Sequence, residues 1–467
     1  MTARQTPARN TATRQRRNRP WLAGALAAMA FWGPAHGQII GGSGGLALPA
    51  PSLPSAGLPD ISGVRTPRLP QTQGAASAVR GLTTQALTQA RRLKLDTLVR
   101  DNPTLLEFDE RGAAVVRGEV LALSPSPEAL ARLQAAGFKA GRSLEAGGLD
   151  IGVTVLELPA GLSAREAVAL ARRLDPAGQY DFNHLYSDAG GDGAAQASPG
   201  PARAPLGAVR VGLIDSGVDT GHPALRGVRI EQRGFAPGGV RPQGHGLATA
   251  SLLVGRQGRF RGAAPGSGLY VADVYGTTPV GGSAASLVQG LAWMAQARVP
   301  VINVSLVGPP NLTLQAAVRT LNARGHLIVA AVGNDGPAAP PLYPAAYPGV
   351  IAVTAVDGRR RVLPEAGRPG RIDFTAPGAD MAVPAVRGGF VAVRGTSFAA
   401  PLVAGSLAGL LPTPDPQGAA RAVSTLARQA LDLGPRGPDA IFGLGLVGFD
   451  LVSPPRAVAA KGMLTSR

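Results

Sequence analysis

The sequence predicts an α/β protein whose larger part is a doubly wound parallel sheet, preceded by a small α+β unit of the ferredoxin-like kind. Two runs, "VINVSL" at 301–306 and "HLIVAAVG" at 326–333, are apolar almost throughout, which is typical of strands buried on both faces. Helical patterns alternate with these runs, as a parallel sheet requires. A length of 467 residues exceeds one ordinary domain, so we expect two folded units.

The first residues predict a signal for export. Arginines and no acidic residue occur before an apolar core from Trp21 to Trp32, and "GPAHGQ" then supplies the small residues Ala35 and Gly37. We expect cleavage after Gly37 and an exported protein, periplasmic or extracellular. The apolar core is too short for a bilayer of about 30 Å, so no stable membrane anchor is expected.

The composition excludes several kinds of chemistry. The formal charge is +17, but the basic residues are scattered and do not alternate with aromatic residues, so nucleic-acid binding is not expected. The chain has no cysteine, which excludes disulfides, a thiol nucleophile and thiolate metal sites. We expect a monomer whose chemistry is performed by oxygen and nitrogen.

Two stretches rich in Gly, Pro, Ser and Ala lack any helical or strand period and read as linkers. They divide the chain into a signal peptide (1–37), a linker (38–80), a small unit (81–187), a second linker (188–205), a large unit (206–455) and a tail (456–467).

The small unit has the order strand, helix, strand pair, helix, strand. The expected elements are a strand at 113–124, a helix at 126–137, a strand pair within 138–161, a helix at 163–174 and a last strand at 180–187. Ser163 and Glu166 have capping-box spacing, which fixes the start of the second helix. This β-α-β-β-α-β order predicts a ferredoxin-like sandwich.

The large unit alternates strands with helices. Strands are expected at 209–215, 269–275, 301–306, 326–333 and 350–356, and helices at 245–255, 285–297 and 314–325. In such a sheet, ligand sites lie at the carboxyl ends of the strands.

Two residues at element ends are candidates for chemistry. Asp215 ends the apolar strand "VGLID", where a half-buried carboxylate needs a donor. His245 is the histidine best placed to donate, because it opens a helix between two glycines that permit close approach. Taken alone, Asp215 also fits a turn or a helix cap, and His245 also fits a buried core histidine.

Two further residues complete the set. Ser397, in "GTSFAAPLVAG", begins a buried helix whose amino end favours negative charge, and Gly395 permits an unusual backbone before it. A serine hydroxyl attacks only when a base removes its proton and a third group orients that base. Asn334 follows the strand that ends at Gly333 and offers an amide donor at the sheet edge.

These motifs resemble those of the subtilisin-like serine proteases. "VGLIDSGVDTGHPAL", "GHGLATASLLVG", "AAVGNDG" and "GTSFAAPLVAG" follow one another in that family's order. The resemblance implies that Asp215 orients His245, that His245 is the general base, that Ser397 attacks the peptide carbonyl and that Asn334 stabilises the oxyanion. It also implies that Ser305, Leu306, Val307 and Gly333 bind an extended peptide substrate, and it implies no cofactor.

The sequence departs from the family pattern in three places. Leu247 replaces the usual Thr, and Val307 replaces the Gly that is usual in the substrate-binding edge. The loop "VGRQGRFR" lacks the Asn- and Asp-rich insertion that resembles a calcium loop in many members, so no metal is expected there.

By its position and element order, the small unit resembles the family's inhibitory propeptides. The resemblance implies a secreted endopeptidase made as a self-processing zymogen, with protein or peptide substrates and its own propeptide as inhibitor. The sequence leaves open a catalytically inactive scaffold, an esterase with the same triad, and a small unit that stays attached as an accessory domain.

Overall fold

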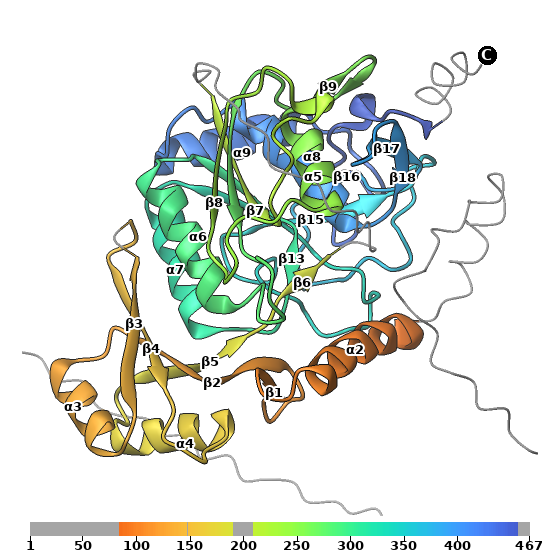
Figure 1. The fold of residues 1–467 in the computed structure, drawn as a ribbon. Coiled ribbons are helices and arrows are strands. Elements are labelled where there is room, and N and C mark those ends of the chain that lie inside the picture. The colour runs from red at the N-terminus through yellow and green to blue at the C-terminus, as the bar shows by residue number, and fades with distance from the viewer. Residues whose placement is uncertain (1–83, 147, 190–208, 456–467) are drawn as a thin grey trace, which may run out of the picture. The chain divides into compact units, whose positions relative to one another are not determined.

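The computed structural model describes residues 84–146, 148–189 and 209–455, and Figure 1 shows their arrangement. All of them belong to one compact unit, Arg68–Arg467. The predicted signal peptide, the linker 38–80 and the tail 456–467 lie outside the described residues.

The larger part is built on a seven-stranded sheet in which all neighbouring strands are parallel. Its order is β16-β15-β14-β12-β7-β11-β8. The strands are β7 (Arg210–Asp215), β8 (Ile230–Gly234), β11 (Gly268–Asp273), β12 (Val301–Val304), β14 (Leu327–Ala331), β15 (Ile351–Val356) and β16 (Phe374–Pro377). The predicted doubly wound sheet is confirmed, with two additional edge strands, β8 and β16.

Helices cover both faces of this sheet (Figure 1). The helices of the larger part are α5 (Gly244–Val254), α6 (Ala284–Gln296), α7 (Leu312–Ala323), α8 (Thr396–Ala408) and α9 (Pro416–Gln429). Neighbouring residues of β7 point to opposite faces, so Leu213 packs in the core beneath α5 and α8, whereas Ile214 packs beneath α6 and α7. Strands with both faces buried are apolar throughout, as the sequence indicated.

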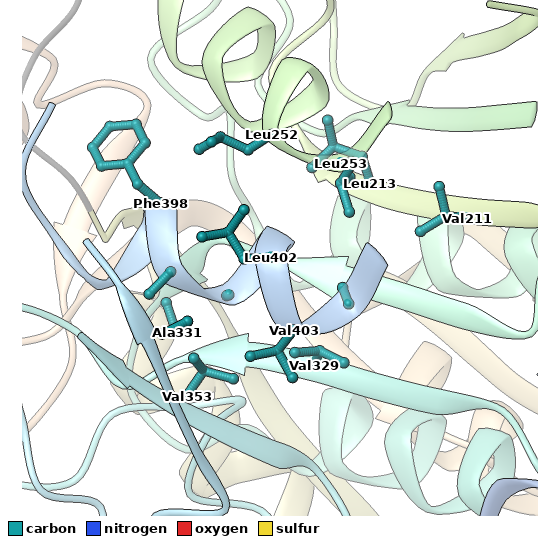
Figure 2. Close-up of a cluster of buried hydrophobic side chains, with 14 of the residues drawn as sticks. Val211, Leu213, Leu252, Leu253, Val329, Ala331, Val353, Phe398, Leu402 and Val403 are labelled. Atoms are coloured by element: carbon teal, nitrogen blue, oxygen red, sulfur yellow. The ribbon is translucent and has the colours of Figure 1, made fainter. Parts of the chain in front are cut away.

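Helix α8 lies in the middle of one of these cores. Figure 2 shows Phe398, Leu402 and Val403 of α8 among side chains of α5 and of the central strands. The residues of α8 are small or apolar on all sides, and all but one of the first twelve are buried. A helix that is apolar all round is a core helix, so α8 holds its amino end at a fixed place relative to the strand ends.

The larger part also contains several short elements. They are the hairpin strands β9 (Arg256–Gln257) and β10 (Phe260–Arg261), the hairpin strands β17 (Met381–Pro384) and β18 (Phe390–Val393), the short strand β13 (Leu306–Val307), and 3₁₀ turns at Pro223–Leu225 and Phe449–Leu451. The loop expected to lack a calcium insertion is the tight β9–β10 hairpin. No helix among the described residues is both long and apolar enough to cross a membrane.

The small part has the expected ferredoxin-like topology. Its antiparallel sheet has the order β5-β2-β4-β3, with β1 also paired to β2. The elements are α2 (Thr84–Asp101), β1 (Leu106–Phe108), β2 (Ala114–Leu123), α3 (Pro127–Ala135), β3 (Lys139–Ala146), β4 (Ile151–Glu157), α4 (Ala164–Leu174) and β5 (Gln179–His184). Ser163 and Glu166 form the predicted capping box.

Two features of the small part differ from the sequence prediction. Helix α2 and strand β1 precede the predicted first strand. The expected last strand, 180–187, is two strands, because β5 ends at His184 and β6 (Ser187–Asp188) pairs with β13 of the larger part. Strand β6 thus extends into the range predicted to be a linker.

Candidate active site

Asp215 and His245 meet at the carboxyl end of β7. The Asp215 side chain is fully buried, and its Oδ1 accepts a hydrogen bond of 2.7 Å from the backbone N–H of Ser216. Nδ1 of His245, in the first turn of α5, lies 3.0 Å from Oδ1 and 2.9 Å from Oδ2 of Asp215. When the ring is neutral, a carboxylate at this distance fixes its tautomer, with the proton on Nδ1 and the lone pair on Nε2.

A second carboxylate lies beside the same imidazole. Asp188 Oδ1 of β6 is 3.9 Å from His245 Nδ1, and the Tyr275 hydroxyl donates to this oxygen over 2.6 Å. Burial lowers the pKa of His245, but the charges of Asp215 and Asp188 raise it by more, to about 9. Burial also raises the pKa of Asp188. In the uncut chain the two carboxylates therefore favour the protonated form of the imidazole.

Ser397 lies in the first turn of α8, directly before a residue whose ring contacts this imidazole. Gly395, the N-cap of α8, has φ 141°, a conformation that favours glycine, as the sequence indicated. The ring centroid of Phe398 is 5.5 Å from that of His245. Ser397 Oγ and His245 Nε2 are buried, and neither has a hydrogen-bond partner among the described residues.

Pro401 and Ser305 together fix the backbone of Ser397. Pro401 is the sixth residue of α8 and lies beyond its first turn. Because proline has no N–H, it cannot donate to the carbonyl four residues earlier, which belongs to Ser397. The Ser305 hydroxyl donates to that carbonyl instead, over 3.1 Å, and the Asn303 amide donates to Ser305 Oγ over 2.8 Å.

Asn334 lies on the other side of the Ser397 turn. Its Oδ1 accepts from the backbone N–H of Thr396 at 3.1 Å, which orients the amide group. Its Nδ2 donates to the backbone carbonyl of Ala189. Asn334 therefore holds the carbonyl of a residue that comes from the small part of the chain.

The chain segment that ends at Ala189 runs through the site as an extended strand. In the antiparallel pairing of β6 with β13, Leu306 is opposite Asp188 and Val307 is opposite Ser187. The N–H of Ala189 donates to the Ser305 carbonyl over 3.0 Å. On the opposite edge of the segment, the N–H of Tyr186 donates to the Gly282 carbonyl over 2.8 Å. Four of the predicted site residues, Ser305, Leu306, Val307 and Asn334, thus contact this segment.

Several residues of the site were not found from the sequence. Thr249 Oγ1, one turn after His245, lies 3.2 Å from Asp215 Oδ2. Arg91 of α2 donates from Nη2 to the Val307 carbonyl over 2.9 Å and from Nη1 to Asp335 over 3.1 Å. For α2, the available signal was the helical spacing of Leu95, Leu98 and Val99. For Asp188, the sequence carried no signal.

Three potential metal ligands lie together in the site. Oxygen atoms of Asp188 and Asp215 and a nitrogen of His245 lie within 4.8 Å of one another. However, the imidazole nitrogen that faces both carboxylates carries a proton shared with Asp215, so the cluster is already an ion-pair network. We propose no metal here.

Comparison with known proteins decides the family. Residues 207–445 match the sequence profile of the Subtilase family. The chain belongs to the subtilase family. It is a serine protease of the subtilisin type, and its seven-stranded parallel sheet is the fold that this family uses.

Relatives of this subtilase match its larger part. Subtilisin Savinase of Lederbergia lenta is 35% identical over 208 residues, which are 43% of this chain and 75% of that protein. Alkaline protease of Alkalihalobacillus alcalophilus is also 35% identical, over 43% of this chain and 53% of that protein. Subtilisin E of Bacillus subtilis is 33% identical over 44% of this chain and 55% of that protein. The chain therefore spans about half the length of several curated relatives.

A solved structure resembles more of the chain. Fervidolysin from Fervidobacterium pennivorans, described as a keratinolytic enzyme related to subtilisin, aligns with a TM-score of 0.59 and 20% identity. The alignment covers 74% of this chain and 62% of fervidolysin. At that identity the likeness concerns the fold.

Proposed function

We propose that this subtilase is an exported serine endopeptidase, made as a zymogen that cuts itself after Ala189. The observation that carries the proposal is the contact of Asn334 Nδ2 with the Ala189 carbonyl. A carbonyl held by a side-chain amide beside a buried serine is the arrangement that a peptide bond needs before acyl transfer.

The proposed roles are supported by the Asp215–His245 contact and by the unpartnered Ser397 Oγ and His245 Nε2. Ser397 Oγ attacks the carbonyl carbon of Ala189, and His245 accepts the serine proton on its free Nε2. Asp215, bonded to Nδ1, stabilises the resulting imidazolium. Asn334 donates to the oxyanion. His245 then protonates the leaving amine, and water releases the acyl-enzyme by the reverse proton path, so the same residues serve both halves of the reaction.

Main-chain pairing supports binding of an extended peptide. Substrates would take the place of residues 185–189 along Ser305, Leu306 and Val307, as β-strand addition does elsewhere. Tyr186, three residues before Ala189, inserts its ring where a side chain at Gly308 would collide with it, and its hydroxyl donates to Pro309 over 2.8 Å. Such pairing selects peptides over simple esters.

The small part is proposed to be an inhibitor and an intramolecular chaperone. Asn183 Oδ1 accepts from the N–H of Ala285 in the first turn of α6, over 3.0 Å. Asp181 Oδ2 accepts from the N–H of Leu312 in the first turn of α7, over 2.7 Å. Helix amino ends need such acceptors. By supplying these acceptors, β5 would stabilise two helices that cover the parallel sheet, a kind of sheet that folds slowly.

Helix α2 is proposed to be a second inhibitory element. Its Arg91 joins the carbonyl of Val307 on the substrate edge to Asp335, which follows the oxyanion residue. Both side chains are mostly buried, with 16% and 15% of their surfaces exposed. A guanidinium with two such partners would hold α2 against the site until the chain is cut.

The remaining assignments rest on the sequence. We propose a signal peptide at 1–37, linkers at 38–80 and from the end of β6 to 205, a propeptide from 81, a catalytic domain at 206–455 and a tail at 456–467. Protein or peptide substrates and the chain's own propeptide are the proposed partners. A monomer and a periplasmic or extracellular location complete the proposal.

The first experiment compares the wild-type chain with Ser397→Ala. Wild type should label with a fluorophosphonate, digest casein and give a new amino terminus directly after Ala189 by N-terminal sequencing. Ser397→Ala should remain uncut and unlabelled. Labelling without casein digestion would indicate an esterase, and a wild-type chain that neither labels nor cuts itself would indicate an inactive scaffold.

The second experiment tests the small part. Residues 205–467 are expressed alone and with residues 81–200 supplied in trans. Activity only with the added segment supports the chaperone role. A truncated chain that folds and cleaves peptides unaided, together with a wild-type product that keeps residues 113–187 covalently attached, would refute the propeptide assignment.

A further inference from the structure

We propose that the side chain of Val307 closes the pocket for the residue before the cleaved bond, so that this protease cuts after small residues such as alanine. The proposal rests on the proposed peptidase function and names the substrate class of that site. It assigns Val307 as a specificity-determining residue.

Two chain segments bracket Ala189, the residue before the proposed cut. One segment contains Ser305, whose carbonyl accepts from the Ala189 N–H over 3.0 Å. The other contains Asn334, whose amide meets the Ala189 carbonyl. Any side chain at this position must enter the space between the two segments.

The strand register places Val307 on the face where that side chain lies. Val307 is directly opposite Ser187, so their side chains share one face of the ladder. Side chains two residues apart in a strand also share a face, so Ala189 lies on the same side as Ser187. Ala189 and Val307 are 3% and 2% exposed and belong to the same apolar cluster.

The space beyond Ala189 is already filled. Gly333, in the opposite segment, has φ 91°, and a Cβ built on it would lie 3.6 Å from Val307 Cγ1. The same Cβ would lie 2.6 Å from Leu342 Cδ1. Val307 and Leu342 therefore reach across to the opposite wall. A methyl group fits in front of them, whereas a longer side chain has to displace them.

The cost of displacing Val307 and Leu342 predicts the size of the preference for small residues before the cut. Forcing extra methylene groups into a packed site lowers the rate for large residues by about 10- to 100-fold. Serine adds one hydroxyl and should be accepted nearly as well as alanine. Peptides with phenylalanine or leucine before the cut should be cleaved most slowly.

The test uses self-cleavage of the full chain. Denatured full-length chains of wild type, Ala189→Ser and Ala189→Phe are diluted into folding buffer, and cleavage is followed on gels. Ala189→Ser should cut close to the wild-type rate, and Ala189→Phe should cut about 10- to 100-fold more slowly. In a double variant, Val307→Gly should restore much of the rate of Ala189→Phe, and Val307→Ala should restore less.

A second measurement does not depend on the folding of any variant. Wild-type processed enzyme is given peptides that carry the sequence of residues 185–188 followed by Ala, Ser, Leu or Phe before the cut. The expected order of kcat/KM is Ala and Ser above Leu and Phe. Equal or higher kcat/KM for Phe, together with rapid self-cleavage of Ala189→Phe, would overturn the role of Val307.

The two proposals fail in different ways. If wild type cuts no peptide and Ser397 does not react with a fluorophosphonate, the peptidase function itself is refuted. If Ser397 reacts and large residues are cut well, the peptidase function stands and the closed pocket is refuted.

Discussion

Replacing Asp188 by asparagine should speed self-cleavage at neutral pH. In the uncut chain, burial lowers the pKa of His245 while Asp215 and Asp188 raise it to about 9, and Lys94 on α2 acts against the two carboxylates. A general base must be neutral to accept a proton. Two units below its pKa, at pH 7, only about 1% of the imidazole is neutral. Self-cleavage should therefore accelerate as the pH rises towards 9.

The structure sets the size of the effect. A carboxylate at about 4–6 Å shifts the pKa of a histidine by about one to three units, and Asp188 is the more distant of the two, at 3.9 Å from Nδ1 compared with 2.9 Å for Asp215. We therefore expect Asp188→Asn to lower the pH midpoint of self-cleavage by about one unit. At pH 7 this corresponds to about a tenfold faster reaction.

The assay follows cleavage of refolded full-length chain on gels between pH 6 and pH 10. Asp188→Glu keeps the charge and is the matched control; its midpoint should stay near that of wild type. The midpoint is the informative quantity, because a change in binding alone scales the rate at every pH. An identical midpoint for wild type and Asp188→Asn would refute the role of Asp188.

The same raised pKa links docking of β6 to pH. His245 has a folded pKa of about 9, above its usual 6.5. Its interaction with the carboxylates is fully present below 6.5 and is lost as the pH rises through about 9. Alkaline pH should thus favour both cutting and release of the segment.

Other substitutions give separate predictions. Ser397→Ala or His245→Ala should lower kcat for a peptide substrate by a factor on the order of 10⁶, the magnitude known for subtilisin itself. Asp215→Asn should lower kcat somewhat less. Asn334→Ala should lower kcat by about 10² to 10³ with little change in KM, since its amide bonds to charge present only in the transition state; an unchanged kcat would mean that other donors suffice. Ser305→Ala should cost about 1–3 kcal/mol of stability in denaturant titrations, because it leaves the buried Ser397 carbonyl without a donor. Arg91→Ala in a propeptide supplied in trans should weaken its inhibition of processed enzyme by about tenfold or more, whereas equal inhibition would show that α2 does not contribute.

Local sequence was sufficient to predict the central strands of the sheet and the polar residues at their ends. Strands buried on both faces are apolar throughout, so their ends are visible as the first polar residue, as at Asp215. In a parallel sheet these ends share one edge, which brings Asp215 and Asn334 to the same side. The edge strands β8 and β16 were missed because β8 is largely polar and β16 ends in a proline.

The contacts of Arg91 on α2 and the role of Pro401 could be found only from the fold. Arg91 has no local pattern that sets it apart from the other arginines of α2, and its partners Val307 and Asp335 are far away in the sequence. Likewise, the lack of an N–H at Pro401 is visible in the sequence, but the donor that replaces it, Ser305, is known only from the packing of α8 against β12.

Strand β6 shows why a composition rule for linkers fails at the proposed processing site. A protease binds the segment that it cuts in an extended form. In this sequence, glycine and small residues follow Ala189, and such a composition reads as a linker. Two residues are also too few for any strand period. The order of β6 comes from its partner: β13 satisfies its backbone groups, and Asn334 and Ser305 hold Ala189. In the proposed processing, cutting the bond after Ala189 removes the covalent link between β6 and the larger part. The small part would then be retained only by contacts such as those of Asp188, Asn183 and Arg91. Release then depends on those charges and caps, which is why the substitutions at Asp188 and Arg91 should change it.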